Sequence, residues 1–241
     1  MKMNKLFSAF AALMLLFTVT SCDNGPDQVQ WSNVVTYQGL SNGQPAVSWQ
    51  GMNDSESIML LLNTNLPADI LPGSRLFLSF IANVDATITN GTVVEPISLV
   101  RVETISPQTV SGTPSEWEGD ELYLQFMFRS GHYLNLQSLI PGATKNESMK
   151  WEFLIDYTTI GTSNIVAYLS YTNTAAEPGA SNSVTYLNCV DINSIMSAGA
   201  KTLTVNINNS NTAPNQDYGP DYGQASQSGK VIVIPMPDYW N

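Results

Sequence analysis

The sequence predicts an all-β protein, and three observations support this fold class. Apolar and polar residues alternate in many short runs, which is the period of a strand with one buried face. Breaks rich in glycine, proline and asparagine separate these runs. The region 31–105 shows no helical period. The length of 241 residues then suits one large β domain or two small ones.

The first 22 residues have the layout of a secretory signal. Lys2 and Lys5 form a positive head, and the uncharged apolar run Leu6–Val19 follows. That run is too short to be a comfortable membrane span. The ending, residues 19–22, resembles a bacterial lipobox, in which a small residue precedes the lipidated cysteine. The resemblance implies cleavage after residues 1–21, diacylation of Cys22 and a chain held on a membrane by its first residue.

A plain secretory signal is the alternative. Free cysteines are avoided in exported chains unless they are paired or modified, which favours lipidation of Cys22. The other cysteine, Cys189, then has no partner for a disulfide, and its strand pattern predicts a buried, inert thiol. We therefore expect a membrane-anchored lipoprotein of the outer membrane, facing either the periplasm or the cell surface.

The charge of the chain excludes some classes of partner. Removal of residues 1–21 takes away two lysines and changes the net charge from −11 to −13. A chain this acidic lacks the positive surface that would attract nucleic acid or an anionic membrane. Contact with a membrane is expected only through the lipid on Cys22.

After the signal, changes in composition divide the rest of the chain into a tether and two domains. Residues 22–30 are short and polar and predict a lipidated tether. A break rich in proline, glycine and serine at 106–119 predicts the boundary between a first β domain, 31–112, and a second, 118–237. Strands are expected at 31–37, 46–49, 57–62, 75–81, 97–105, 121–129, 132–136, 151–157, 165–171, 184–190, 203–207 and 231–234. In 121–129 the expected apolar face consists of Leu122, Leu124, Phe126 and Phe128.

Three stretches resemble the NigD-like lipoproteins of Bacteroidales. They are Gly73-Ser74-Arg75-Leu76-Phe77-Leu78-Ser79-Phe80, the strand 99–105, and Gly131-His132-Tyr133-Leu134-Asn135-Leu136. The resemblance implies an N-terminal OB-like barrel and a C-terminal immunoglobulin-like sandwich. It implies no established activity, and it transfers no functional residue to this chain.

The sequence offers no set of residues that specifies a reaction. His132 is the only histidine, which excludes a multi-histidine metal site, and no nucleophile elbow, phosphate loop or metalloprotease motif occurs. Glu116 and Glu118 flank Trp117, but a solvated loop explains them better than a glycosidase pair. We expect no catalysis, no cofactor and no metal.

The loop 217–223 is the best candidate for binding a ligand. Asp217, Tyr218, Asp221 and Tyr222 form a doubled Asp-Tyr-Gly pattern around a proline. Tyrosines can present flat faces to a glycan or a protein, and aspartates can accept hydrogen bonds or hold calcium. The alternative is a surface loop whose tyrosines fold back onto the sandwich.

The expected function is that of a non-catalytic, lipid-anchored envelope protein. It would act as a binding or assembly module for a glycan or a protein. Two alternatives stay open, which are an envelope hydrolase that uses surface carboxylates and a fimbrial or adhesin-type subunit.

Overall fold

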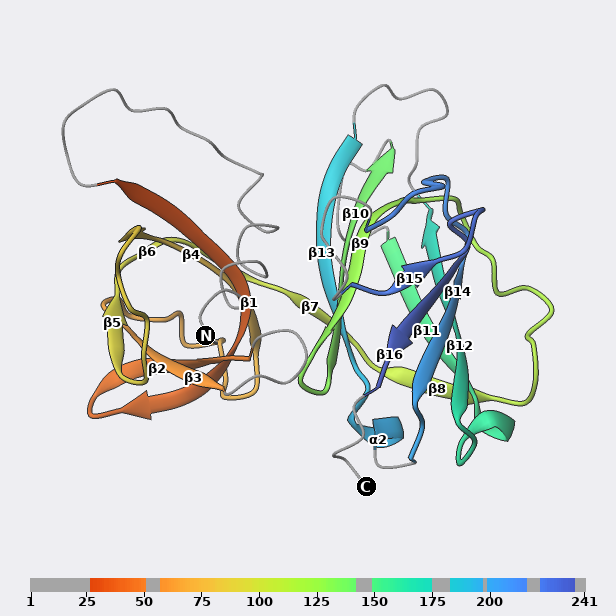
Figure 1. Ribbon diagram of the computed structural model, residues 1–241, viewed down its shortest axis with the longest axis horizontal. Coiled ribbons are helices and arrows are strands. Elements are labelled where there is room, and N and C mark those ends of the chain that lie inside the picture. Colours follow the sequence, from red (N-terminus) through yellow and green to blue (C-terminus); the bar gives the residue numbers. More distant parts are fainter. Residues whose placement is uncertain are drawn as a thin grey trace. The chain divides into compact units, whose positions relative to one another are not determined.

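The computed structural model describes residues 27–50, 57–141, 149–174, 183–196, 199–215 and 222–236. The chain divides into a first unit that ends at Val102 and a second that begins at Glu103. Both consist almost entirely of strands, so the all-β class is confirmed (Figure 1). Among these residues, no helix reaches the length and apolarity that crossing a membrane requires. The predicted signal and Cys22 lie outside the described residues.

The first unit is one curled sheet of six strands in the order β5-β3-β2-β1-β4-β6 (Figure 1). Its strands are β1 (Gln28–Ser41), β2 (Gln44–Trp49), β3 (Ile58–Leu62), β4 (Arg75–Asn83), β5 (Thr92–Val94) and β6 (Pro96–Arg101). The two edge strands, β5 and β6, follow each other in the chain with only Glu95 between them. Because consecutive strands cover opposite edges of the sheet, it must curl into a barrel-like form, as the OB-like expectation requires.

Alternation explains the core of this barrel. Leu76, Leu78 and Phe80 are all buried on one face of β4, as the sequence predicts. The long strand β1 pairs with both β2 and β4 and bends at a bulge next to Gly39. Gly39 has a φ of +100°, which a glycine adopts without strain.

The predicted tether is shorter than expected. Residues 28–30 belong to β1 and pair with residues 81–83 of β4. Polarity suggested a flexible segment, but backbone pairing with β4 continues through these residues, and the side-chain amide of Gln30 also donates a hydrogen bond of 2.8 Å to the Ser79 hydroxyl. A polar outward face is normal for a half-exposed antiparallel strand.

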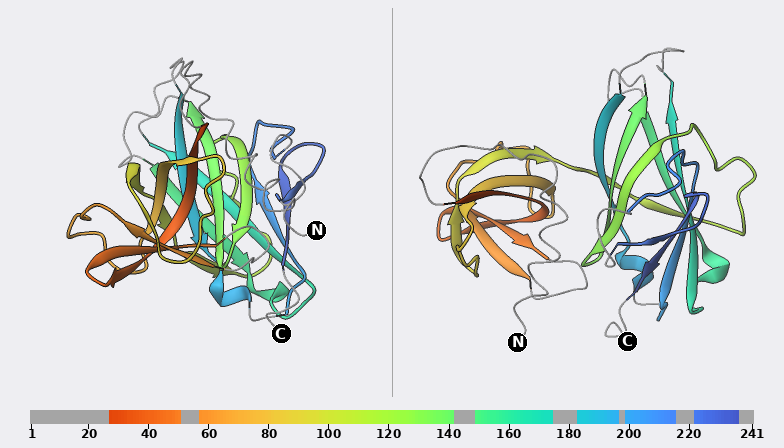
Figure 2. Two further views of the ribbon diagram at one scale, coloured as in Figure 1. Left: turned by 60° about the vertical axis from the view of Figure 1, so that its left-hand side comes forward. Right: turned by 45° about the horizontal axis from the view of Figure 1, so that its top comes forward.

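The second unit consists of two sheets that pack as a sandwich (Figure 2). One sheet has the order β7-β13-β10-β9 and the other β15-β16-β14-β12-β11-β8. The elements are β7 (Glu103–Ile105), β8 (Pro107–Val110), β9 (Tyr123–Ser130), β10 (Tyr133–Pro141), β11 (Met149–Asp156), the 3-10 turn η4 (Tyr157–Thr159), β12 (Asn164–Asn173), β13 (Ser183–Asp191), α2 (Asn193–Met196), β14 (Thr202–Ile207), β15 (Gln224–Ala225) and β16 (Val231–Pro235). Large apolar side chains from both sheets fill the space between them.

The boundary between the units lies earlier in the chain than the sequence predicts. The run 97–105, expected to be one strand, is interrupted at Val102, so that β6 joins the first unit while β7 pairs with β13 of the second. The break at 106–119, expected to be a linker, contains β8, which pairs in parallel with β11. Its initial Pro107 is compatible with this place because β8 is an edge strand.

The apolar face predicted for β9 is also corrected. Leu122 and Leu124 face the core between the sheets, and so does Met127. A register irregularity opposite Gln137 and Ser138 shifts the alternation, so Phe126 and Phe128 lie on the other face. Strict alternation could not anticipate this because one extra residue reverses every side chain beyond it.

Candidate binding site

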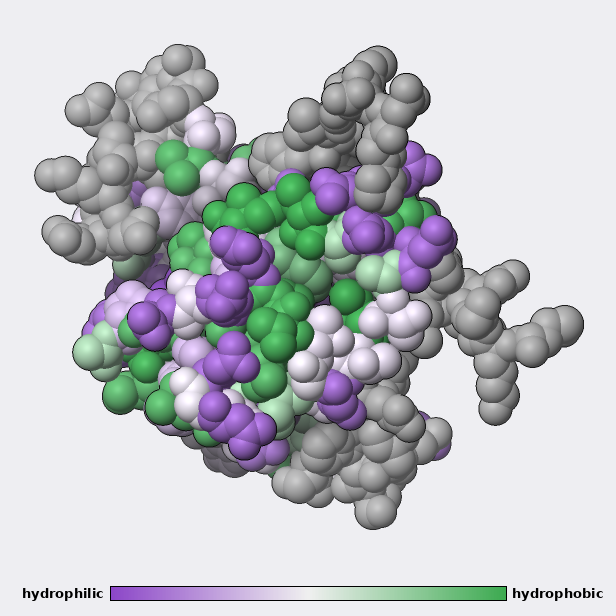
Figure 3. All heavy atoms as spheres, turned by 90° about the vertical axis from the view of Figure 1, so that its left-hand side faces the viewer, coloured by the Kyte–Doolittle hydropathy of each residue, from purple (hydrophilic) through white to green (hydrophobic). Residues whose placement is uncertain are grey.

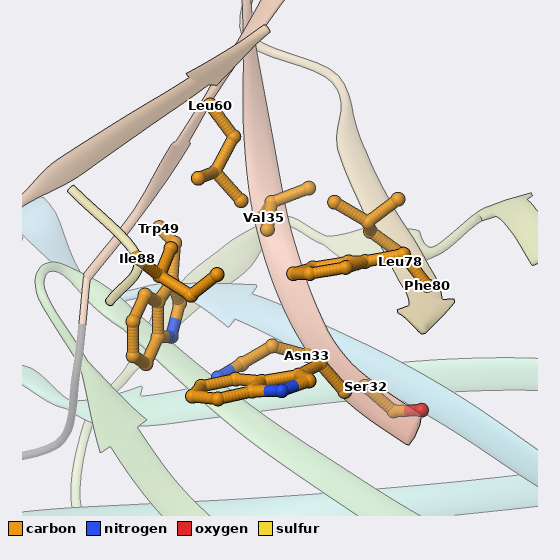
Figure 4. A pocket seen from close by; sticks show the side chains of 9 residues that line it. Ser32, Asn33, Val35, Trp49, Leu60, Leu78, Phe80 and Ile88 are labelled. Atoms are coloured by element: carbon orange, nitrogen blue, oxygen red, sulfur yellow. The ribbon is translucent and has the colours of Figure 1, made fainter. Parts of the chain in front are cut away.

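An apolar opening lies at one end of the first unit's barrel. Five buried side chains from all of β1 to β4 form its floor: Val35, Trp49, Leu60, Leu78 and Phe80. Four partly buried residues form its rim: Trp31, Ser32, Asn33 and Ile88. We call these nine residues the barrel mouth. Figure 4 shows the side chains of Val35, Trp49 and Ile88 directed toward a common space.

The mouth is organised by an aromatic pair on neighbouring strands. Trp31 of β1 is paired with Phe80 of β4, and their rings are nearly parallel, with centroids 6.2 Å apart and an interplanar angle of 9°. Cross-strand aromatic pairs stabilise a sheet, and here the pair also leaves the partly exposed indole of Trp31 at the opening. The strand pairing fixes both rings before any partner arrives.

The size and polarity of the mouth limit what it can hold. Its free volume is about 20 Å³, which is room for roughly one small group of atoms. Asn33 is the amide at the rim, and its Oδ1 already accepts a hydrogen bond of 2.7 Å from Val34 N. The mouth therefore suits the tip of an apolar side chain and offers few partners to a hydroxyl-rich ligand.

Most of the residues singled out from the sequence are not part of this site. Glu116 and Glu118 are exposed, while Trp117 between them packs against Tyr168 with ring centroids 5.2 Å apart. His132 is partly buried, and its ring contacts Tyr133. Among the described residues, no group of three or more histidine, cysteine or acidic side chains is arranged to hold a metal ion.

The loop 217–223 is described only in part. Asp217, Tyr218 and Asp221 lie outside the described residues, and their role in binding stays a prediction. Tyr222 is 1% exposed, and its ring lies 5.1 Å from Phe128 and 6.0 Å from Phe126 between centroids. The expectation that Tyr222 presents its ring to a ligand is therefore corrected, because this ring covers two phenylalanines of β9.

The barrel mouth could not be predicted from the sequence, for a physical reason. Trp31 and Trp49 fit the alternation of core residues, and nothing in a strand pattern distinguishes a core position from one at an open barrel end. One feature of the sequence pointed weakly to this opening, which is the position of the two tryptophans. Both tryptophans stand near a strand end, where an inward side chain can border on solvent.

Comparisons with known proteins agree with this fold. No family model and no curated protein matches the chain. Solved structures do match. One is a protein of unknown function from Bacteroides vulgatus, with 11% identity, a TM-score of 0.59 and coverage of 87% of this chain and 92% of that one. A candidate lipoprotein from Bacteroides fragilis has 13% identity, a TM-score of 0.55 and coverage of 86% and 98%.

The third match bears on the resemblance of the sequence to the NigD-like lipoproteins. A NigD-like immunity protein from Bacteroides caccae has 13% identity and a TM-score of 0.51, and the match covers 90% of this chain and 93% of that one. Likeness at such low identity concerns the fold alone. The expected resemblance is confirmed at that level, and this chain has the all-β fold of a NigD-like protein.

Proposed function

We propose that this protein is a lipid-anchored, non-catalytic component of the outer membrane that binds a partner through the barrel mouth of its first unit. The observation that carries the proposal is the preformed aromatic opening around Trp31, Trp49 and Phe80. Apolar pockets at the mouths of β-barrels are common binding sites. The fold shared with a candidate lipoprotein supports the anchor, as does the lipobox-like ending at Cys22.

Detergent partition tests the anchor. The wild-type protein is expected in the detergent phase, because acyl chains on Cys22 add about 0.8 kcal/mol of membrane affinity per buried methylene group. The variant Cys22→Ala should move to the aqueous phase. Cys189→Ala is the matched control and should partition like the wild type. Full retention of Cys22→Ala with the membrane would place the anchor elsewhere.

Site-specific photo-crosslinking in intact cells tests binding at the mouth. A benzophenone amino acid in place of Ile88, at the rim, is expected to give a covalent adduct with the partner. The same group in place of Asp69, which is exposed and lies outside the mouth, is the control. Equal adducts from both positions, or none from position 88, would contradict a binding role for this opening.

The hydrolase alternative has less support than binding. Glycoside hydrolysis needs two carboxylates that face one cleft, whereas the exposed Glu116 and Glu118 belong to a loop beside Trp117. Turnover in a broad hydrolysis screen that disappears in the Glu116→Gln, Glu118→Gln double variant would reverse this preference. For the fimbrial alternative, the corresponding observation is formation of polymers.

A further inference from the structure

An acidic hollow lies at the ends of two of the strands that line the barrel mouth, before β1 and after β4. Asp27, Asn83, Val84, Asp85 and Ala86 line a hollow of about 370 Å³ next to the ends of β1 and β4. We call it the acidic hollow. Its backbone is ordered by two hydrogen bonds of 2.9 Å, from Val84 N to Asp27 O and from Ala86 N to Asn83 O.

Strand register places the hollow close to the mouth. Asn83 of the hollow and Phe80 of the mouth are three residues apart on β4, which at about 3.3 Å per residue is roughly 10 Å along the strand, and they lie on its exposed and its buried face respectively. The loop after β4 joins the two sites, because Asp85 lines the hollow and Ile88 lines the mouth. Figure 3, which looks onto the first unit, shows an apolar surface that polar side chains interrupt.

The negative charge of the hollow favours cationic groups. Asp27 and Asp85 are both exposed carboxylates. The only basic residues of the described first unit are Arg75 and Arg101, and no described basic side chain forms an ion pair with either aspartate. These two charges are therefore available to a cationic group from outside.

We propose that the mouth and the hollow together bind an extended peptide segment of a protein partner, in which an apolar side chain is followed by a lysine or arginine. The apolar tip enters the mouth, and the cation lies between Asp27 and Asp85. The 10 Å separation corresponds to about three residues of extended chain. This inference rests on the proposed function and specifies its partner.

A glycan fits these two sites less well. A sugar needs several hydrogen-bond partners around an aromatic face, whereas the floor of the mouth carries aliphatic and aromatic side chains. The two carboxylates give a peptide cation a charge-assisted contact that a neutral sugar does not make. The net charge of −13 after removal of residues 1–21 adds a long-range attraction for basic partners.

Three synthetic peptides test the proposal. The first is the fluorescein-labelled sequence Gly-Ser-Leu-Ser-Ser-Lys-Ser-Gly, the second has glutamate in place of lysine, and the third has serine in place of leucine. Binding to the full chain is measured by fluorescence anisotropy at low salt. We expect the first peptide to bind at least tenfold more tightly than either other peptide, and its affinity to fall as salt screens the ion pairs.

Protein variants assign each effect to its site. Asp27→Asn with Asp85→Asn should remove the preference for lysine over glutamate, while the exposed Asp69→Asn should keep it. Trp31→Ala should remove the preference for leucine over serine. Thermal unfolding by circular dichroism checks that each variant is folded. Since Trp31 also packs on Phe80, Ile88→Ser, at the rim, is a second variant for the mouth.

The outcomes separate the inference from the proposed function. Equal affinity for the lysine and glutamate peptides, or a preference that survives loss of both aspartates, overturns the inference. If no peptide binds while the benzophenone at position 88 still forms an adduct, the partner is of another class, so the inference fails and the proposed function stands. If neither peptide binding nor an adduct is found, both fail.

Discussion

The side chain of Asn215 hydrogen-bonds to both backbone groups of Met127, as a neighbouring strand would. Its Oδ1 accepts from Met127 N at 2.9 Å, and its Nδ2 donates to Met127 O at 3.4 Å and to Gly223 O at 2.6 Å. Two asparagines share this task nearby, since Asn209 Oδ1 accepts from Leu124 N at 2.8 Å and Asn211 Nδ2 donates to Leu124 O at 2.6 Å. Asparagine side chains thus cover the edge of β9, which would otherwise be open to pairing with another chain.

Replacement of Asn215 by alanine should destabilise the second unit by about 3 kcal/mol, because Met127 N and Gly223 O lose their bonds to this side chain, while Met127 O keeps its bond from Gly223 N. Asn215 also has a φ of +69°, which alanine adopts with strain. Asn215→Gly keeps the backbone freedom and loses only the hydrogen bonds, so it separates the two causes. Urea unfolding measures both variants, and an unchanged midpoint for Asn215→Gly would show that the hydrogen bonds contribute little.

Some of this architecture could be predicted from the sequence. Alternation located the longer strands but not the short strands β5, β8 and β15. Burial of one face imposes a period of two on a strand whose other face is exposed to solvent, and the pattern is too short to read in strands of two to four residues. The bulge in β9 could not be predicted, since the sequence around Gln125 continues the same alternation. The edge cover by Asn209 and Asn215 was missed as well, because asparagine-rich segments are typical of loops and their partners are distant in sequence.

The candidate site was less predictable than the fold. Trp31, Trp49 and Ile88 come together only when the sheet curls, and the curl depends on β5 and β6 lying at opposite edges. The loop 217–223 attracted attention for its composition. The burial of Tyr222 beside Phe126 depends on the reversed face of β9, which alternation alone predicts wrongly.

Tyr222→Ala should lower the free energy of unfolding by about 3 to 5 kcal/mol, the range for removing a buried aromatic ring. The reason is its contact with Phe126 and Phe128. Tyr222→Phe keeps the ring and is expected to lose much less. Chemical denaturation compares the two, and a Tyr222→Ala variant within about 0.5 kcal/mol of the wild type would match an exposed loop residue instead.

Ser138→Ala should stabilise the second unit by about 1 kcal/mol, which is unusual for a core substitution. The Ser138 hydroxyl is fully buried and has no hydrogen-bond partner within the part of the chain that the structure describes, so the methyl group of alanine removes an uncompensated polar atom. Ser79 is the matched control. It is equally buried, but its hydroxyl bonds to Gln30 at 2.8 Å and Ser32 at 3.1 Å.

The two serine variants should therefore have opposite signs. Ser79→Ala is expected to destabilise the first unit by about 1 kcal/mol because it leaves the Gln30 amide and the Ser32 hydroxyl without this partner. Calorimetry of each variant against the wild type gives both values. A loss of stability in Ser138→Ala would indicate that its hydroxyl is satisfied in solution.

Tyr171 gives the second unit a dependence on alkaline pH. Burial raises the pKa of its phenol to about 12, assisted by the negative charge of Asp120, while the neighbouring Asn173 side chain acts in the opposite direction. The ring of Tyr171 packs against Trp151 with centroids 4.9 Å apart. An unfolded tyrosine has a pKa of about 10, so the fold favours the neutral phenol.

The sign of the effect follows from these two pKa values. The stabilisation is fully present below about pH 10, and it is lost as the pH rises through the folded pKa of about 12. Tyr171→Phe removes the ionisable hydroxyl and keeps the ring. The difference in unfolding free energy between wild type and Tyr171→Phe should therefore be constant up to pH 10 and then shift against the wild type.

Absorbance at about 295 nm, where tyrosinate absorbs, should show one late step that is absent from the variant. A constant difference across this range, together with loss of an absorbance step near pH 10 in Tyr171→Phe instead of the late step, would mean that Tyr171 ionises as freely in the folded chain as in the unfolded one, whose pKa is about 10.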